Sequence, residues 1–538
     1  MILITSGAYL QGEFTNEIGL LPPSFLPIGN KRLYEYQVDF ILKSITYDDI
    51  YISIPESFEI NKCDIKKLEE LGVNIIRVPD SLSLGDSILF CWNSALKIYD
   101  NLLILHGDTL FCNLFFAADK DFVSVHKNLG FYRRASLIEK RGVRLIESHW
   151  SESDDKVLSG LFFFKNPRFF IKSLVESRGD FVDSLAAYNN SYKFQVISSG
   201  DWLDFGHLIG FYKSRSKLTT QRAFNDLEIN NKWVKKSSSE KNIKIIAEAK
   251  WFENIPLKLK LYLPQIIDFN SDDPDNCFYK LEYLYMLPLS DIYVFGKLSK
   301  GGWDCIFGCI KEVLDAFSSV SVPSNIAFED FSNLYLTKTL DRLKDFIGSN
   351  EIKFSNQKIS LDGEKFYSIW DIAKKSAEYI KPSTLNDVGI VHGDMCFSNV
   401  LFDFRVERVK LIDPRGMGYD GEYTIYGDKR YDYAKLYHSV CGGYDLIISN
   451  RYNLDYEEVP NGIIFDFDIY SDDYFDNVKN IFIKKVVDSS SYSENEILAI
   501  NVHLFLSMLP LHSDRPERQL AFLANALRLF VRLMEIVK

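Results

Sequence analysis

Three side chains in the C-terminal half of the chain have the types and the spacing that phosphoryl transfer requires. Asp394 lies between two apolar runs, Asn399 follows it by five positions, and Asp413 ends another apolar run nineteen positions after Asp394. Phosphoryl transfer from a nucleotide needs a carboxylate beside the acceptor hydroxyl, and an amide oxygen and a second carboxylate that hold Mg²⁺ on the phosphates. Each residue alone would be read as a turn cap or a solvated side chain, but the spaced triplet indicates a kinase site.

His392-Gly393-Asp394, together with Asn399 and Asp413, resembles the acidic motif of the aminoglycoside phosphotransferase and choline kinase family. The resemblance implies a bilobal protein-kinase-like fold in which Asp394 is the catalytic base, Asn399 and Asp413 bind Mg²⁺, and His392 supports the loop through hydrogen bonds. It also implies that ATP is the phosphoryl donor and that the acceptor is a hydroxyl of a small sugar, polyol or amino alcohol.

A kinase N-lobe has a lysine on a strand and a glutamate on the next helix, and their ion pair positions the lysine on the nucleotide phosphates. Lys236 and Glu248 fit these roles. Lys235 directly precedes Lys236, and because side chains alternate along a strand, only one of the two can face the cleft. We favour Lys236. Glu282 opens a segment that looks like the hinge, where backbone groups would meet an adenine.

Two further residues lie after the acidic motif. Asp432 belongs to the segment 427–436, which resembles the family's sequence after the magnesium loop, and we expect it to fix that loop structurally. Arg415 follows Asp413 by two positions. It could bind a phosphate or an acidic part of the acceptor, or it could form a salt bridge to Asp428 or Asp432.

The N-terminal part carries a different motif. Residues 26–37 resemble a signature of the sugar-phosphate nucleotidylyltransferases, and the resemblance extends over residues 1–215. These enzymes join a nucleoside triphosphate to a phosphorylated sugar or alcohol and release pyrophosphate. The resemblance implies that Lys31 and the loop around Gly85 bind the nucleotide, which could be CTP or another nucleoside triphosphate.

Asp108 and Asp204 are the candidate metal ligands of this part, because the resemblance places them in its two metal-binding segments. Strand ends on one edge of a doubly wound sheet meet where such folds bind ligands. Two carboxylates there can hold a Mg²⁺ that bridges the nucleotide and the attacking phosphate. The alternative is that both residues only form turns.

The phosphate-binding end departs from the nucleotidylyltransferase pattern. That family opens with a glycine-rich loop that contains an arginine. Here the first strand runs into residues 6–13, which contain no arginine and few glycines. Tyr9 and Leu10 would keep backbone amides from cradling phosphates, and Glu13 would repel them. The lysine that usually precedes the Leu-Pro-Ile segment is also missing. These losses leave open a catalytically silent domain.

The elements that must position these residues follow from hydrophobic periodicity. Over the first ~210 residues, short apolar runs alternate with amphipathic stretches, which predicts a parallel sheet covered by helices. The expected strands are 1–5, 50–54, 74–78, 102–106, 122–126, 158–164 and 194–198, and the expected helices are 33–45 and 86–98. Later segments are expected to be a polar, mostly helical connection (215–232), a β-rich piece with one helix (233–290), a mostly helical part (295–450) and a two-helix tail (494–538).

The predicted fold class is an α/β doubly wound, Rossmann-like nucleotidyltransferase sheet domain followed by an α+β bilobal protein-kinase-like domain. The predicted boundaries are 1–215 for the nucleotidyltransferase-like domain, 216–294 for the kinase N-lobe and 295–538 for the kinase C-lobe.

The composition suits several folded domains, with 538 residues of which 46% are hydrophobic and 25% charged. A net charge of −12 argues against a nucleic-acid partner. The eight cysteines read as free thiols of a reducing compartment. The N-terminus lacks the basic region of a signal peptide, and no apolar run approaches the ~20 residues of a membrane span. We therefore expect a cytoplasmic protein without membrane insertion, and homo-oligomerisation is left open.

The leading hypothesis is a bifunctional enzyme that phosphorylates a small molecule and then activates the product as a nucleotide conjugate. By resemblance, such pairs serve bacterial capsule or surface polysaccharide synthesis. The runner-up is a kinase with a catalytically silent nucleotidyltransferase-like domain that acts as a sensor or scaffold. A third hypothesis is a non-enzymatic assembly protein, and the intact kinase triplet counts against it.

Overall fold

The computed structural model describes residues 1–45, 49–95, 97–116, 118–127, 134–139, 143–148, 156–198, 200–218, 226–238, 242–271, 277–323, 331–349 and 357–537. The chain divides into two compact units. The N-terminal unit comprises Met1–Thr219 with Phe295–Lys297, and the C-terminal unit comprises Thr220–Val294 with Leu298–Lys538. The three-domain division with boundaries after residues 215 and 294 stays a prediction.

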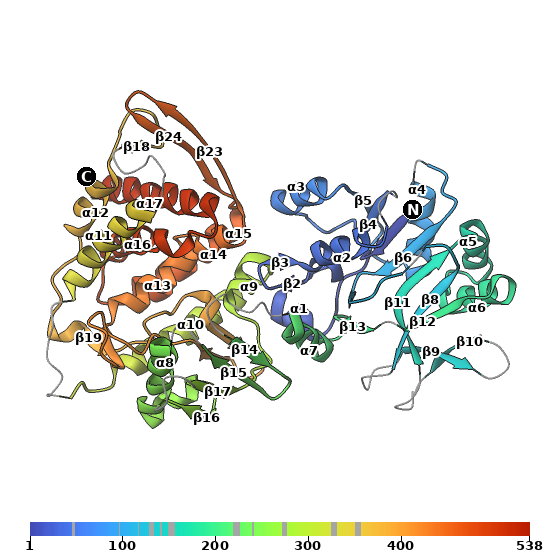
Figure 1. Ribbon diagram of the computed structural model, residues 1–538, viewed down its shortest axis with the longest axis horizontal. Coiled ribbons are helices and arrows are strands. Elements are labelled where there is room, and N and C mark those ends of the chain that lie inside the picture. Colours follow the sequence, from blue (N-terminus) through green and yellow to red (C-terminus); the bar gives the residue numbers. More distant parts are fainter. Residues whose placement is uncertain are drawn as a thin grey trace. The chain divides into compact units, whose positions relative to one another are not determined.

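A nine-stranded mixed sheet forms the centre of the N-terminal unit (Figure 1). β1 (Ile2–Thr5) runs parallel to β4 (Ile50–Pro55) and β6 (Leu102–His106), and β4 runs parallel to β5 (Val73–Val78). β11 (Lys156–Phe164) is antiparallel to β6. The central strands are nearly continuous apolar runs because both faces of the sheet are covered. The outer strands are β8 (Phe122–Lys127), β9 (Arg134–Glu139), β10 (Val143–Ser148) and β12 (Gln195–Ser198).

Three helices pack against one face of this sheet and bury a common core. They are α4 (Leu84–Ser94), α5 (Pro167–Glu176) and α6 (Phe181–Tyr192). Their apolar side chains, such as Ile88 and Phe170, belong to one buried cluster with strand residues from β1, β6 and β11. This core fixes the strand ends that carry the candidate residues. The other helices of the unit are α1 (Glu13–Ile18), α2 (Leu33–Leu42), α3 (Lys62–Glu70) and α7 (Leu208–Leu218).

The C-terminal unit begins with a four-stranded antiparallel sheet in the order β14-β15-β17-β16. α8 (Asn242–Asn254) follows β15 and buries Glu248 and Trp251. The 3-10 helix η2 (Leu257–Tyr262) then leads into β16. The strands are β14 (Asp226–Ile229), β15 (Trp233–Ser237), β16 (Ile266–Asn270) and β17 (Phe278–Glu282).

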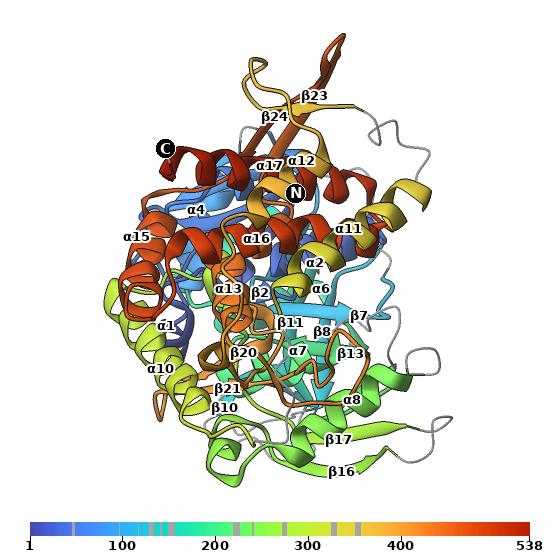
Figure 2. The ribbon, with the colours of Figure 1, turned by 90° about the vertical axis from the view of Figure 1, so that its left-hand side faces the viewer.

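The larger part of this unit is mostly helical, with α16 (Glu494–Met508) at its centre (Figure 2). Nearly every residue of α16 is buried because α11, α12, α13 and α17 pack around it. The helices are α9 (Leu289–Phe295), α10 (Lys300–Ser318), α11 (Ser332–Ser349), α12 (Ile369–Ala377), α13 (Arg430–Val440), α14 (Tyr444–Ile448), α15 (Asp473–Phe482) and α17 (Pro516–Ile536). No helix in the described ranges is long and apolar enough to cross a membrane.

Short strands interrupt the helices and carry the acidic motif. β19 (Val388–Ile390) precedes it and pairs with β22 (Tyr426–Asp428), whereas β20 (Val400–Asp403) and β21 (Arg408–Leu411) form a hairpin after it. A longer hairpin, β23 (Tyr452–Val459) and β24 (Gly462–Ile469), pairs at one edge with β18 (Ile359–Ser360).

The predicted fold class is confirmed: an α/β sheet unit precedes an α+β unit with a sheet-rich part and a helix-rich part. The seven predicted strands of the N-terminal unit are present, and their ends differ from the predicted ones by at most two residues. Three expectations were wrong. The sheet was predicted to be parallel, but β11 runs antiparallel to β6 and β8. The predicted helices 33–45 and 86–98 end earlier, at Leu42 and Ser94. The segment 215–232 contains the strand β14, because its apolar residues pair with β15.

Candidate functional site

Asp394 lies in the loop between β19 and β20, and its side chain is held from two sides. The Nζ atom of Lys435, on α13, lies 2.9 Å from Asp394 Oδ1. The amide of Asn399 donates to Asp394 Oδ2 at 3.1 Å and to its backbone oxygen at 2.9 Å. The Asp394 side chain remains 40% exposed, so a ligand can reach it.

The backbone of this loop is fixed by Asp432. Its buried carboxylate accepts hydrogen bonds from the amides of His392 at 2.7 Å and Gly393 at 2.8 Å. Gly393 has a φ of 75°, and a Cβ atom there would meet Arg415 Cβ at 2.8 Å. Burial raises the pKa of Asp432 to about 7, although the two amide hydrogen bonds oppose the shift.

His392 connects the loop to the strand end that carries Asp413. Its Nε2–H donates to the carbonyl oxygen of Ile412 at 3.0 Å, and its Nδ1 accepts from the amide of Asp394 at 3.3 Å. Burial lowers the pKa of His392 to about 4, so the ring is neutral near pH 7. This neutral tautomer matches both hydrogen bonds, and through them His392 positions the loop.

Lys236 is the lysine of β15 that faces the acidic residues. Its Nζ lies 2.7 Å from Glu248 Oε2 and 3.2 Å from Asp413 Oδ1. Lys235 points the other way and pairs with the exposed Glu228 at 3.3 Å. The Lys236 and Glu248 side chains are only 5% and 0% exposed, so this ion pair is screened little by water.

Tyr279, opposite Lys236 in the β15–β17 ladder, completes this group. Its hydroxyl donates to Glu248 Oε2 at 2.7 Å and lies 3.4 Å from Asp413 Oδ1. Burial raises the pKa of Glu248, and the nearby charge of Lys236 opposes the shift. Sequence reasoning did not identify Tyr279, although strand register alone would have placed it beside Lys236.

The charge of Lys435 controls the ionisation of Asp394. Desolvation alone would raise the pKa of Asp394, but the ammonium group and hydrogen bond of Lys435 hold it below its usual range. The sequence analysis also missed Lys435. It lies three residues after Asp432 on α13, and residues at this spacing share a helix face. The helix face that binds the loop through Asp432 therefore also presents Lys435 to it.

Asn399 and Asp413 have the donor atoms that suit Mg²⁺. Asn399 uses its NH₂ group on Asp394, and among the described residues its amide oxygen accepts from the Ser398 hydroxyl alone, at 3.3 Å. Carboxylate and amide oxygens are preferred ligands of this ion. Clusters of three or more His, Cys, Asp or Glu side chains that could hold a metal do not occur in the described ranges. The Mg²⁺ role of Asn399 and Asp413 stays a prediction.

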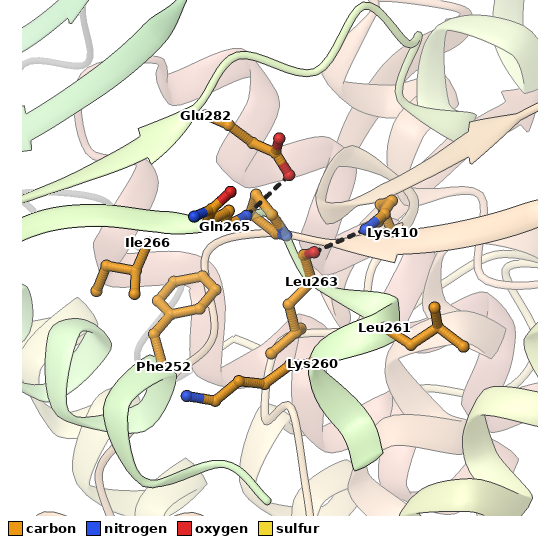
Figure 3. A pocket seen from close by; sticks show the side chains of 9 residues that line it. Phe252, Lys260, Leu261, Leu263, Gln265, Ile266, Glu282 and Lys410 are labelled. Carbon is orange, nitrogen blue, oxygen red and sulfur yellow. Dashed lines mark hydrogen bonds between the residues drawn. The ribbon is translucent and has the colours of Figure 1, made fainter. Parts of the chain in front are cut away.

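Glu282, the predicted hinge residue, uses its groups within the sheet. Its backbone amide donates to the Gln265 carbonyl, and its carboxylate accepts from the Gln265 amide, both at 2.9 Å. The Glu282 side chain lines a cavity of about 490 Å³ beside η2 and β16 (Figure 3). Lys410 borders the same cavity and donates to the Leu263 carbonyl at 2.8 Å. A base at the hinge would therefore meet residues after Glu282. The nucleotide-binding role of Glu282 stays a prediction.

Arg415 does not form the predicted salt bridge to Asp428 or Asp432. Asp428 is bound by Arg430, at 2.6 Å between Asp428 Oδ2 and Arg430 Nη2, and Asp432 is occupied by the loop amides. The Arg415 guanidinium instead lies 5.9 Å from the ring centre of Tyr431.

In the N-terminal unit, the two predicted metal ligands converge beside Gly206. Asp108 ends the turn after β6, and Asp204 ends β13 (Asp201–Asp204), which pairs with β7 (Thr109–Cys112). A Cβ atom on Gly206 would collide with Asp108 Oδ2 and would lie 3.4 Å from Asp204 Oδ1. Both carboxylates therefore lie beside Gly206, and two neighbouring carboxylates can share a cation. Their metal role stays a prediction.

The predicted nucleotide-binding residues of this unit, Lys31 and Gly85, lie on different elements. Lys31, on β3 (Lys31–Arg32), is exposed. Gly85 lies in the first turn of α4, where a Cβ atom would collide with the Gly179 carbonyl oxygen, so close backbone packing requires a glycine there. In the segment after β1, Leu10 is buried and Tyr9 contacts the Ser57 hydroxyl at 2.8 Å.

Comparisons with known proteins found no matching family model and no matching curated protein. Among solved structures, the chain is similar to a nucleoside-diphosphate-sugar pyrophosphorylase from Vibrio cholerae RC9 (12% identity, 40% of this chain and 99% of that chain, TM-score 0.34). It is also similar to the CTP:phosphocholine cytidylyltransferase from Streptococcus pneumoniae (14% identity, 40% of this chain and 98% of that chain, TM-score 0.33). A third similar structure is the GDP complex of aminoglycoside 2'-phosphotransferase-IIIa (12% identity, 58% of this chain and 91% of that chain, TM-score 0.37).

Proposed function

We propose that the C-terminal unit transfers the γ-phosphoryl group of ATP to a hydroxyl of a small molecule such as a sugar, polyol or amino alcohol. The observation that carries this proposal is the buried Lys236–Glu248 ion pair, whose lysine also lies 3.2 Å from Asp413. A strand lysine fixed by a helix glutamate beside a magnesium-binding aspartate is the arrangement that positions nucleotide phosphates for transfer.

Asp394 is the base in this reaction. Lys435 and Asn399 orient its carboxylate, which accepts the proton of the acceptor hydroxyl. The acceptor oxygen forms a bond to the γ-phosphorus, the bond from that phosphorus to the β–γ bridging oxygen breaks, and ADP leaves. Mg²⁺ held by Asn399 and Asp413 would neutralise phosphate charge. Lys236 binds the phosphates that remain on the nucleotide.

The test is a mass-spectrometric screen of the full-length protein with ATP, Mg²⁺ and a panel of sugars, polyols and amino alcohols. A product heavier by one phosphate is expected, and Asp394→Asn should slow its formation by about 10²–10⁴-fold. Asp466→Asn, at an exposed position of β24, is the matched control. An Asp394→Asn protein as active as the control would refute the assignment.

A second activity is favoured by the convergence of Asp108 and Asp204 beside Gly206. In this proposal the phosphorylated product attacks the α-phosphorus of CTP or another nucleoside triphosphate, the α–β bond breaks and pyrophosphate leaves. The conjugate would serve bacterial surface polysaccharide synthesis. Adding CTP to the screen tests this activity through pyrophosphate release, which Asp108→Asn should abolish and Asp201→Asn, earlier on β13, should not. Phosphorylation without pyrophosphate release would instead favour a silent N-terminal unit.

A further inference from the structure

Three cationic side chains from separate segments surround the ring of Tyr431 beside Asp394. Lys338 comes from α11, Arg415 from the loop after β21, and Lys435 from α13. Their charged groups lie 5.5, 5.9 and 5.9 Å from the ring centre. We call Lys338, Arg415 and Lys435 the cation cluster.

The cation cluster is poorly neutralised by the protein. Lys435 is paired with Asp394 at 2.9 Å. Lys338 has a 3.4 Å contact with the Tyr431 hydroxyl, and neither Lys338 nor Arg415 has a carboxylate partner in the part of the chain that the structure describes. Lys435 also interacts with the buried carboxyl group of Asp432, so among the described residues both nearby acidic groups act on Lys435.

The pKa values of Tyr431 and Lys338 reflect the closeness of these cations. Burial would raise the pKa of Tyr431, but Lys338, Lys435 and Arg415 together lower it to about 8. The Tyr431 hydroxyl favours the charged form of Lys338, whereas burial and the two neighbouring cations lower the pKa of Lys338 overall. Lys338 and Arg415 have no carboxylate partner among the described residues, so collecting them beside Lys435 costs free energy that a bound anion would offset.

We infer that the cation cluster binds an anionic group of the acceptor, either a phosphate or a carboxylate, and so restricts the kinase to acidic alcohols. The inference rests on the proposed kinase function. Lys435 links the cluster to Asp394, the residue that faces the acceptor, whereas the donor phosphates already have Lys236 and Mg²⁺. A guanidinium and two ammonium groups are suitable partners for either anion.

The test measures binding of matched small molecules by titration calorimetry to the full-length protein. A non-hydrolysable ATP analogue and Mg²⁺ are present at saturation, so the γ-phosphate position is filled and an added anion must bind elsewhere. The probes are glycerol, glycerate and glycerol 3-phosphate. We expect one of the two anions to bind about tenfold or more tightly than glycerol, and the better anion identifies the group.

Lys338→Gln should remove this preference, and Lys338→Arg should restore most of it. Lys344→Gln is the control, because Lys344 lies on the same helix and pairs with the exposed Asp341 at 2.9 Å. Equal binding of neutral and anionic probes, or a preference that survives in Lys338→Gln, would overturn the inference. Failure of the wild-type protein to bind the ATP analogue would instead count against the proposed kinase function.

Discussion

Lys235 and Lys236 are neighbours on β15 but have opposite environments. Lys236 is 5% exposed and pairs with a fully buried glutamate, whereas Lys235 is 32% exposed and pairs with Glu228 on the surface. Surface pairs contribute about 0–1 kcal/mol, but removal of one partner of a buried pair costs about 3–5 kcal/mol. The two lysines therefore form an internal control for each other.

Lys236→Met should lower the rate of the proposed phosphoryl transfer by about 10²–10³-fold. It should also reduce stability, because Glu248 and Asp413 lose their shared cation. Lys235→Met should change both quantities little. Steady-state kinetics and urea unfolding of the two variants check this expectation. Similar losses in both variants would show that the ion pair does not serve the nucleotide.

The sequence could indicate Lys236 because alternation along a strand is a local rule. It could indicate Asp394, Asn399 and Asp413 because their spacing reflects the lengths of a loop and a hairpin. Lys338 could not be found in this way, since it lies more than fifty residues before Asp394 and reaches the site through helix packing.

At the scale of elements, apolar runs predicted the central strands, because burial on both faces requires them. The hairpin β23–β24 was not predicted. Its strands carry acidic residues, and half of the side chains of β23 are exposed, so the hairpin lacks a strong hydrophobic signal. The short ladder β7–β13 was not predicted either, since its pairing joins segments about ninety residues apart.

α14 carries a buried carboxyl group that makes stability depend on pH. Asp445 is 4% exposed, and its Oδ2 has no hydrogen-bond partner in the described residues. Burial raises the pKa of Asp445 to about 7, and the neighbouring Asp291 adds to the shift. In the unfolded chain an aspartate pKa is about 3.9. Between these values the folded protein holds a proton that the unfolded chain releases, so stability is lost as pH rises through about 7.

Asp445→Asn should therefore become more stable relative to the wild type as the pH rises from about 5 to about 8, by on the order of 2 kcal/mol. Urea unfolding of both proteins at the two pH values measures the difference. Asp466→Asn should show no such trend. A difference independent of pH would mean that Asp445 is ionised throughout.

At the scale of the whole molecule, two units with separate cores should unfold in separate steps. A non-hydrolysable ATP analogue with Mg²⁺ should raise the Tm of only one step, because a ligand at 100 times its Kd stabilises the unit that binds it by about 2.7 kcal/mol. Differential scanning calorimetry with and without the analogue tests this. Lys236→Met should cancel the shift. A single transition that moves as a whole would show strong coupling between the units.

The contact between Gly85 and Gly179 has a consequence for the evolution of this chain. A side chain on Gly85 would strike the Gly179 carbonyl, and one on Gly179, whose φ is 79°, would meet Asp86 Oδ1 at 2.5 Å. Gly85 cannot change without moving α4 away from the turn between α5 and α6, and Gly179 is constrained by its positive φ, which other residues rarely adopt. Descendants of this sequence should therefore keep both glycines, or replace them together with a change in the spacing of these helices, whether or not the N-terminal unit retains an activity.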